Sequence, residues 1–143
     1  NMKGVSNGKV IDADKEYAVA EDYRKKLKTK CPSVEQNVGN LSGGNQQKVL
    51  LAKWMFTEPD ILILDEPTRG IDVGAKYEIY CIINDLVAAG KSVIMISSEL
   101  PEVLGMSDRI YIMNEGKFVG EVGKEEATSE LIMSKIVKSG KGA

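Results

Sequence analysis

Two short apolar runs constrain the fold of this chain more than any other feature of its sequence. They are ILIL at residues 61–64 and VIMI at residues 93–96, and a helical pattern closed by Gly90 lies between them at residues 73–90. Strands that are apolar at every position are typical of a parallel sheet whose two faces are both covered. The sequence therefore predicts an α/β fold with parallel core strands flanked by helices.

The remaining periodic segments each have the length of one helix or one strand. They are residues 13–30, 44–56, 99–106 and 124–138 as helices, and residues 109–114 with 117–122 as a hairpin through Glu115-Gly116. Trp54 lies at helical spacing in its segment and is expected to pack in the core. Residues 1–40 are polar, and the alternation of helices and strands begins at Leu41, so the organisation of the chain changes there.

The charge balance and the residue types exclude several function classes. The chain has 19 basic and 21 acidic residues, so it lacks the basic surface with which proteins grip nucleic acid. Its apolar runs are far shorter than the roughly 20 residues of a membrane span. Cys31 and Cys81 show neither CxxC nor disulfide-type spacing, which is typical of a reducing cytosol. Histidine is absent, which removes the commonest general base and metal ligand at neutral pH.

The octet LSGGNQQK, from Leu41 to Lys48, places two glycines at the start of a predicted helix. One interpretation is a helix cap, in which the Ser42 hydroxyl accepts a backbone N–H of the first turn. The other is a phosphate site, in which Gly43 and Gly44 let an anion approach bare N–H groups at the positive end of the helix dipole. Taken alone, the octet leaves both interpretations open.

A carboxylate pair, Asp65 and Glu66, closes the apolar run in the segment ILILDEPTRGID. One interpretation is a strand end that turns into solvent. However, Pro67 stops the strand abruptly, a turn containing glycine leads to Asp72, and open α/β sheets place ligands at the carboxyl ends of their strands. Adjacent carboxylates there can divide phosphoryl transfer, one holding Mg²⁺ and the other deprotonating the attacking water. Chemistry on a nucleotide triphosphate is the leading hypothesis.

Taken together, LSGGNQQK and ILILDEPTRGID resemble the signature motif, Walker B strand and D-loop of ATP-binding-cassette (ABC) ATPases. With DEPTRGIDVGAK and ISSELPEVLGMSDRI, the chain is similar to the second cassette of tandem carbohydrate-importer subunits of the galactose/methyl-galactoside, ribose and xylose type. The resemblance runs from about Ser33 to Val137. It implies the downstream half of a cassette: a partial helical subdomain at residues 1–50, ending in the signature helix, and a RecA-like α/β part at residues 51–143 with Walker B, D-loop, switch region and a C-terminal hairpin plus helix.

The resemblance also implies roles for individual residues. The contact to the γ-phosphate of an ATP held by an opposing cassette would come from Ser42, Gly43, Gly44, Asn45 and Gln46. Asp65 would hold the Mg²⁺ shell and Glu66 would be the general base. Asp72 would lie in the D-loop, across the interface between cassettes.

The implied cofactors are ATP and Mg²⁺. The implied partners are an opposing cassette, membrane permease subunits and, indirectly, a periplasmic or extracellular sugar-binding protein, with no nucleic acid. Such a subunit would be cytoplasmic and peripheral on the inner face of the membrane, where ATP hydrolysis drives monosaccharide import. The alternative is a catalytically degenerate cassette half that acts as a docking or regulatory module.

One departure from the family pattern concerns the switch region. The family commonly has Thr-His-Asp after the second apolar strand, whereas this chain has Ser97-Ser98-Glu99. Ser98 is shorter than histidine and uncharged near neutral pH, so the site built on Asp65 and Glu66 is expected to turn over slowly. Ser98 also has an interpretation as an ordinary turn residue.

A second departure concerns the Walker A loop, G-x-x-x-x-G-K-[ST], which must follow a strand and open a helix. The one GKS triplet, Gly90-Lys91-Ser92, has Asp85 where the motif requires glycine, and it leaves a helix to enter a strand. We therefore expect the Walker A half and the glutamine loop to lie before Asn1 in a longer polypeptide. The chain alone is expected to be inactive.

Overall fold

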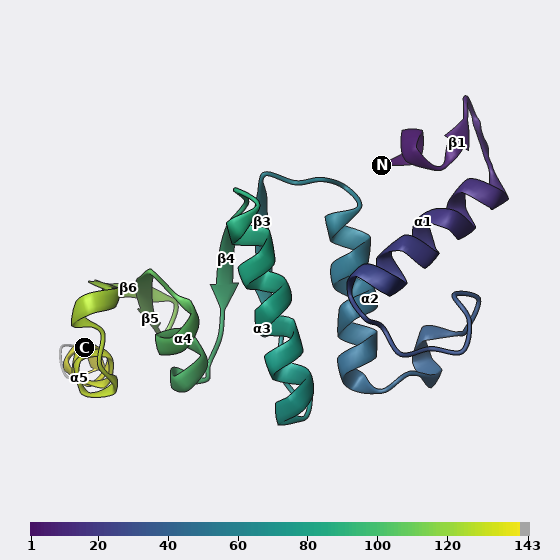
Figure 1. Cartoon of the computed structure of the whole chain (residues 1–143). Coiled ribbons are helices and arrows are strands. Elements are labelled where there is room, and N and C mark those ends of the chain that lie inside the picture. The colour runs from purple at the N-terminus through teal and green to yellow at the C-terminus, as the bar shows by residue number, and fades with distance from the viewer. Residues whose placement is uncertain (141–143) are drawn as a thin grey trace. The chain divides into compact units, whose positions relative to one another are not determined.

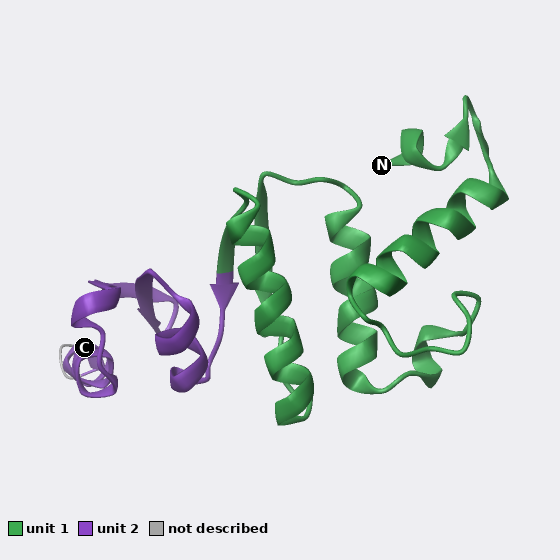
Figure 2. Ribbon diagram, viewed as in Figure 1, with its two compact units in different colours: residues 1–94 green, residues 95–143 purple. Residues whose placement is uncertain are grey.

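The chain forms two compact units, Asn1–Ile94 and Met95–Ala143, in a computed structural model that describes residues 1–140 (Figure 2). Each unit has its own buried side chains, Leu51 and Ile79 in the first and Ile110 in the second. Within residues 1–140, every helix is too short or too polar to span a bilayer.

The first unit opens with a short hairpin that the sequence pattern did not predict. A 3-10 helix, η1 (Met2–Gly4), precedes the antiparallel strands β1 (Ser6–Asn7) and β2 (Val10–Ile11). Gly8, between the strands, has a φ of 70°, in the left-handed region that glycine enters freely. Strands of this length are too short to show an alternating pattern.

Helix α1 (Ala13–Lys26) begins at Asp12, whose carboxylate accepts two backbone N–H groups of the first turn. The helix ends earlier than the sequence pattern predicted. The reason is that Lys28 is left-handed, with a φ of 51°, and the N–H of Thr29 returns to the carbonyl of Arg24. A left-handed residue with such a return bond closes a helix.

Helices α2 (Gly43–Met55) and α3 (Val73–Ala88) pack against each other, and the 3-10 helix η2 (Val38–Asn40) precedes α2 (Figure 1). The buried residues of α2 are Gly44, Lys48 and Leu51, whose spacing places them on one face of the helix. Three isoleucines give α3 a matching buried face. The two helices therefore bury one face each.

Trp54 contradicts the expectation that it packs in the core. Its side chain is 47% exposed, and the ammonium of Lys53 lies 5.6 Å from the centre of its ring. The aliphatic stem of a lysine can cover an aromatic face while the charge stays in water. The tryptophan is therefore a surface residue in the described part of the chain.

Strand β3 (Ile61–Asp65) pairs with β4 (Ser92–Ile96), and the second unit begins within β4. The two leucines of β3 are buried, whereas Ile61 and Ile63 are 60% and 63% exposed. Alternate side chains of a strand point to opposite faces. The expectation that both faces are covered is therefore wrong for β3 within the described residues, which bury only the face with the leucines.

The second unit is built around the hairpin that the sequence predicted. Its elements are α4 (Leu100–Met106), β5 (Arg109–Asn114), β6 (Lys117–Gly123), the 3-10 helix η3 (Lys124–Glu126) and α5 (Ser129–Gly140). The antiparallel strands turn at Glu115 and Gly116, whose φ angles of 48° and 74° suit a two-residue hairpin turn. The core of the unit consists of Ile110, Ile112, Val122 and Ile132.

The final helix begins later than the sequence pattern predicted, at Ser129 instead of Lys124. Thr128 caps it, because its hydroxyl accepts the backbone N–H of Leu131 at 3.1 Å. The residues before this cap form η3 instead of a turn of α5.

Candidate functional site

The start of α2 carries the predicted signature residues, with Ser42 at the N-cap position. The Ser42 hydroxyl makes no capping hydrogen bond to the helix backbone. Instead, Nδ2 of Asn45 donates to Oγ of Ser42 at 2.8 Å. Oδ1 of Asn45 accepts the backbone N–H of Lys30, also at 2.8 Å. The structure thus contradicts the cap interpretation for the hydroxyl, which a neighbouring side chain holds instead.

The two glycines bring the start of α2 close to the segment that follows β3. A Cβ atom at Gly44 would lie 2.5 Å from Cβ of Ala75, closer than two non-bonded carbon atoms approach each other. A Cβ atom at Gly43 would lie 3.3 Å from Cγ2 of Ile71. Sequence reasoning assigned both glycines to the approach of a phosphate, but Gly44 is also required for close packing of α2 against α3.

Four predicted site residues line one pocket of about 270 Å³: Ser42, Gly44, Asn45 and Asp72. The rest of the lining is formed by Lys30, Gly74, Ala75 and Glu78, which sequence reasoning did not identify. Asp72 is the N-cap of α3, and its Oδ1 accepts the backbone N–H of Ala75 at 2.9 Å. The structure therefore brings the serine of the octet and the aspartate of the DEPTRGID segment to the same pocket.

Two other predicted signature residues do not line this pocket. Gln46 turns back along the chain, where its Nε2 donates to the carbonyl of Leu41 at 2.8 Å. Gly43 lies beside Ile71. The structure thus divides the octet into residues that face the pocket and residues that shape the start of the helix.

Lys48, the last residue of the octet, is buried, with its side chain 2% exposed. Its Nζ lies 2.7 Å from Oε2 of Glu78 on α3 and donates to the carbonyl of Lys28 at 3.1 Å. The hydrogen bond from Lys48 lowers the pKa of Glu78, although partial desolvation opposes the shift. Sequence reasoning gave Lys48 no role. The available signal was its helical spacing from Gly44 and Leu51, which places a lysine on the buried face.

The carboxylate pair lies at the end of β3, away from the pocket lining. Asp65 is the exposed last residue of the strand, and Glu66 follows with a φ of 47°. A non-glycine residue in this left-handed region stores backbone strain, which concentrates at functional sites. The N–H of Arg69 donates to the carbonyl of Glu66 at 3.2 Å across this turn, and Thr68 in the turn is buried.

The donor chemistry at the end of β3 fits part of a magnesium shell. Within residues 1–140, no group of three or more acidic, histidine or cysteine side chains could hold a metal ion by itself. Proteins usually hold Mg²⁺ with one or two carboxylates, while water and substrate phosphates supply the other ligands. The carboxylate of Asp65 can provide one of these protein ligands.

Ser98 lies in the second unit, in the exposed turn between β4 and α4. The preceding Ser97 shapes this turn, because its hydroxyl accepts the backbone N–H of Glu99 at 3.0 Å. Glu66 belongs to the first unit, so a role of Ser98 at that carboxylate stays a prediction.

The triplet Gly90-Lys91-Ser92 has the context that the sequence predicted. Gly90 follows α3 with a φ of 85°, and Ser92 begins β4. Lys91 lies 3.3 Å from the carboxylate of Asp60, as a surface ion pair. The predicted order of helix, triplet and strand is confirmed, and it is the reverse of a phosphate-binding loop.

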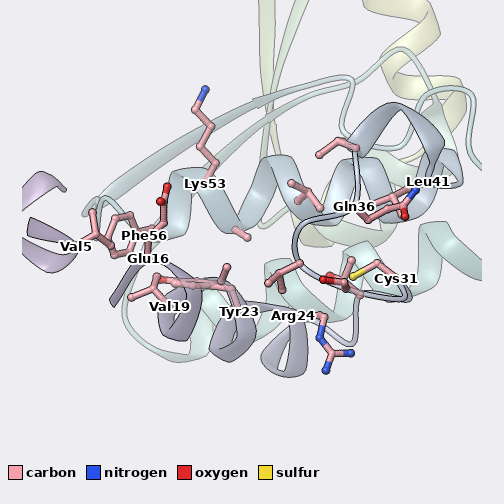
Figure 3. Close-up of a pocket in the computed structure, with 17 residues that line it drawn as sticks. Val5, Glu16, Val19, Tyr23, Arg24, Cys31, Gln36, Leu41, Lys53 and Phe56 are labelled. Carbon is pink, nitrogen blue, oxygen red and sulfur yellow. The ribbon is translucent and has the colours of Figure 1, made fainter. Parts of the chain in front are cut away.

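A larger cavity of about 430 Å³ lies elsewhere in the first unit, between α1, residues 29–41 and α2 (Figure 3). Val19, Tyr23 and Phe56 contribute to its mainly apolar wall. The charged ends of Arg24 and Lys53 point away from it (Figure 3). None of the predicted site residues lines this cavity, so the pocket at the start of α2 is the candidate site.

The chain is similar to known transport proteins. Residues 3–69 match the family described as ABC transporter. Three similar curated relatives are the L-arabinose transport ATP-binding protein AraG of Geobacillus stearothermophilus (62% identical), the xylose import ATP-binding protein XylG of Geobacillus kaustophilus (58%) and the ribose import ATP-binding protein RbsA of Clostridium tetani (57%). Each match covers at least 93% of this chain but 26% of the relative, so the chain spans about a quarter of their length.

Solved structures agree with the predicted fold. MJ1267, an ATP-binding cassette of an ABC transporter, matches with a TM-score of 0.73 and 29% identity over 85% of this chain and 48% of its own. A nucleotide-free cassette from an ABC transporter matches with a TM-score of 0.74 and 27% identity, over 88% and 50% of the two chains. The predicted α/β fold is confirmed, and the chain corresponds to about half of each structure.

Proposed function

The chain belongs to the ABC transporter family as part of an ATPase domain, and on this premise we propose that it serves ATP-driven import of a monosaccharide. It contributes the signature motif and the Walker B strand to an ATP-binding subunit. The observation that carries this proposal is the shared pocket of Ser42, Asn45 and Asp72. Identities of 57% to 62% with proteins named for arabinose, xylose and ribose transport support a sugar of this class.

In this proposal, the signature residues act on a nucleotide held by an opposing cassette. Ser42 is exposed at the mouth of the pocket, at the positive end of the α2 dipole. The terminal phosphate binds there at the start of α2, which residues 42–46 form, and Asp72 meets the opposing cassette beside it. The pocket thus forms one half of a composite site.

The end of β3 forms the hydrolytic half of a different site. Glu66 accepts the proton of the attacking water, and Asp65 holds the magnesium shell. When bound, Mg²⁺ neutralises charge that develops on the phosphates. Ser98 replaces the expected histidine, so we propose that this site is the weaker of the two in the assembled transporter.

We assign residues 1–50 to the helical subdomain and residues 51–143 to the RecA-like part. The sequence offers no G-x-x-x-x-G-K-[ST] loop, so another part of the subunit supplies the grip on the β-phosphate. The partners are the opposing cassette, membrane permease subunits and, through them, a sugar-binding protein. The subunit works at the cytoplasmic face of the membrane.

The test compares two substitutions in the intact subunit, assembled with its permease. Ser42→Arg fills the pocket and blocks the phosphate at the opposing site, whereas Glu66→Gln keeps the shape of the side chain but removes the base. Loss of one such group is worth about a hundredfold or more at its own site. Ser42→Arg is expected to remove most of the steady-state ATPase activity, and Glu66→Gln a smaller share.

The matched control is Leu50→Arg, because Leu50 is exposed on the same helix and does not line the pocket. This variant is expected to keep the wild-type rate. Equal losses for Ser42→Arg and Glu66→Gln would mean that the two sites act only together. Full activity of Ser42→Arg would contradict the proposed function of the pocket.

A further inference from the structure

The backbone N–H of Lys30 fixes the orientation of the Asn45 side chain. A backbone N–H can only donate, so the Asn45 atom 2.8 Å away is the carbonyl oxygen Oδ1. The other end of the amide is then the NH₂ group, which lies 2.8 Å from Oγ of Ser42 and donates to it. This contact removes the usual ambiguity between the two ends of an asparagine side chain.

The Ser42 hydroxyl consequently keeps its hydrogen for another partner. A serine hydroxyl has one hydrogen to donate and two lone pairs to accept with. Asn45 occupies one lone pair, and the helix backbone makes no capping bond with the hydroxyl. Asn45 is the only hydrogen-bond partner of this hydroxyl in the described part of the chain. The O–H group can therefore donate to a ligand in the pocket that it lines.

The segment that orients Asn45 is itself held in place. Lys28 is left-handed, with a φ of 51°, and its carbonyl accepts the buried ammonium of Lys48 at 3.1 Å. The N–H of Lys30 thus belongs to a backbone segment that hydrogen bonds fix to α2. A rigid donor at this place holds the amide in one orientation.

The two carboxylates of the pocket lining, which also includes Lys30, make a correctly oriented donor important. The two carboxylates of its lining are both engaged: Asp72 accepts the N–H of Ala75, and Glu78 pairs with Lys48. Neither can donate a hydrogen bond to an anion. A phosphate oxygen in the pocket therefore depends on O–H and N–H donors, including Ser42.

We propose that Asn45 is a positioning residue, which keeps the Ser42 hydroxyl as a donor towards the terminal phosphate of the nucleotide. The inference rests on the proposed function and refines it. Asn45 acts through Ser42 instead of binding the phosphate itself, and the backbone of Lys30 holds Asn45 in the active orientation.

The test is a double-mutant cycle in the intact subunit assembled with its permease. The variants are Ser42→Ala, Asn45→Ala and the double variant, each assayed for kcat and KM with Mg-ATP. Removal of one preorganised donor lowers kcat about a hundredfold. We expect Ser42→Ala to lose about that much, Asn45→Ala to lose at least tenfold with little change in KM, and the double variant to lose no more than Ser42→Ala. Losses that multiply in the double variant would overturn the proposal, because Asn45 would then act independently of Ser42.

Two further variants separate positioning from folding. Asn45→Asp keeps the shape of the side chain and the oxygen that accepts the N–H of Lys30, but it replaces the NH₂ group beside Ser42 with a second acceptor. The Ser42 hydroxyl then donates to this acceptor and turns its hydrogen away from the ligand. We expect the kcat of Asn45→Asp to fall at least as far as that of Asn45→Ala. Wild-type kcat in Asn45→Asp would overturn the proposal. Gln47→Ala removes a neighbouring amide of α2 outside the pocket lining and is expected to keep wild-type rates. An inactive wild-type assembly would overturn the proposed function and this inference together, whereas an active one with independent losses overturns the inference alone.

Discussion

The ammonium of Lys48 lies 2.7 Å from the carboxylate of Glu78, although the lysine side chain is 2% exposed and the glutamate side chain is 45% exposed. The pair joins α2, which begins after Ser42, to α3, which begins after Asp72. Lys48 also donates to the carbonyl of Lys28, so three segments meet at one ammonium group. Lys48 and Glu78 therefore differ in how well water can solvate the charge that is left when the other partner is removed.

Replacement of the more exposed partner is expected to cost more stability. Glu78→Leu leaves the ammonium of Lys48 buried with only a carbonyl partner, and breaking a fully buried pair costs about 3–5 kcal/mol. Because Glu78 is partly solvated, we expect about 2 kcal/mol. Lys48→Met keeps the volume and leaves a carboxylate that water can reach, so about 1 kcal/mol is expected for the lost hydrogen bond. Urea unfolding of the two variants measures both values.

The double variant Lys48→Met/Glu78→Leu is the control for this comparison. It removes the buried charge, so it is expected to be more stable than Glu78→Leu alone. A larger loss for Lys48→Met than for Glu78→Leu would show that burial of the ammonium does not decide the outcome.

The lowered pKa of Glu78 predicts an acid dependence of stability. The ionised carboxylate contributes fully above the pKa of an unfolded glutamate, about 4.3, and the contribution is lost as pH falls through the lower folded value. The difference in free energy of unfolding between wild type and Glu78→Gln should stay constant between pH 7 and about pH 5, and then shrink towards pH 3. A difference that grows on acidification would contradict the assignment.

Gly44→Ala is expected to destabilise the protein, although alanine favours a helix by about 1 kcal/mol over glycine. The new Cβ atom would lie 2.5 Å from that of Ala75, and overpacking of this kind typically costs about 1–3 kcal/mol. Ala75→Gly removes the opposing atom, so Gly44→Ala/Ala75→Gly should recover part of the loss. Thermal unfolding of the three variants measures the recovery, and an unrescued double variant would locate the strain elsewhere.

The exposed isoleucines of β3 predict self-association of the 143-residue chain when it is studied by itself. Apolar strand faces and open edges promote pairing between copies. Ile63→Lys places a charge on this face and is expected to lower the associated fraction in sedimentation velocity. Tyr77→Lys is the matched control, because Tyr77 is 69% exposed on α3 and not on a strand. A monomeric wild-type chain at high concentration would contradict the prediction.

Titration calorimetry of the same chain with Mg-ATP is expected to show very weak binding and no hydrolysis. The reason is the reversed context of Gly90-Lys91-Ser92, where the lysine pairs with Asp60 instead of extending from a glycine-rich loop. Lys91→Ala should therefore leave the calorimetric signal unchanged. Micromolar affinity in the wild-type chain would contradict this prediction.

Sequence periodicity was sufficient to predict the strands and turns that depend on local sequence alone. The apolar runs predicted β3 and β4. Gly116 indicated the turn of the hairpin, because glycine adopts the positive φ of such a turn freely. The start of α5 was missed because the cap at Thr128 outweighs helical propensity in the residues before it. The exposed face of β3 was missed because apolar letters do not show which face the described chain covers.

Some residues of the candidate site could be predicted from local sequence, and others could not. Motifs identified Ser42, Asn45 and Asp72, but their meeting in one pocket depends on the packing of α2 against α3. Lys30 and Glu78 line that pocket because residues far apart in sequence contact each other, and sequence periodicity does not predict such contacts. Local sequence patterns thus identified the candidate site residues, and tertiary contacts determine how their side chains are oriented.

The hairpin core of the second unit has a consequence for the order of folding. Strands β5 and β6 are neighbours in sequence, and α5 follows them closely before it adds Ile132 to their core. Contacts between neighbouring segments close small loops, so they lose little chain entropy and form quickly. The amide hydrogens of residues 109–123 should therefore gain protection early in refolding and exchange together as one cooperative group.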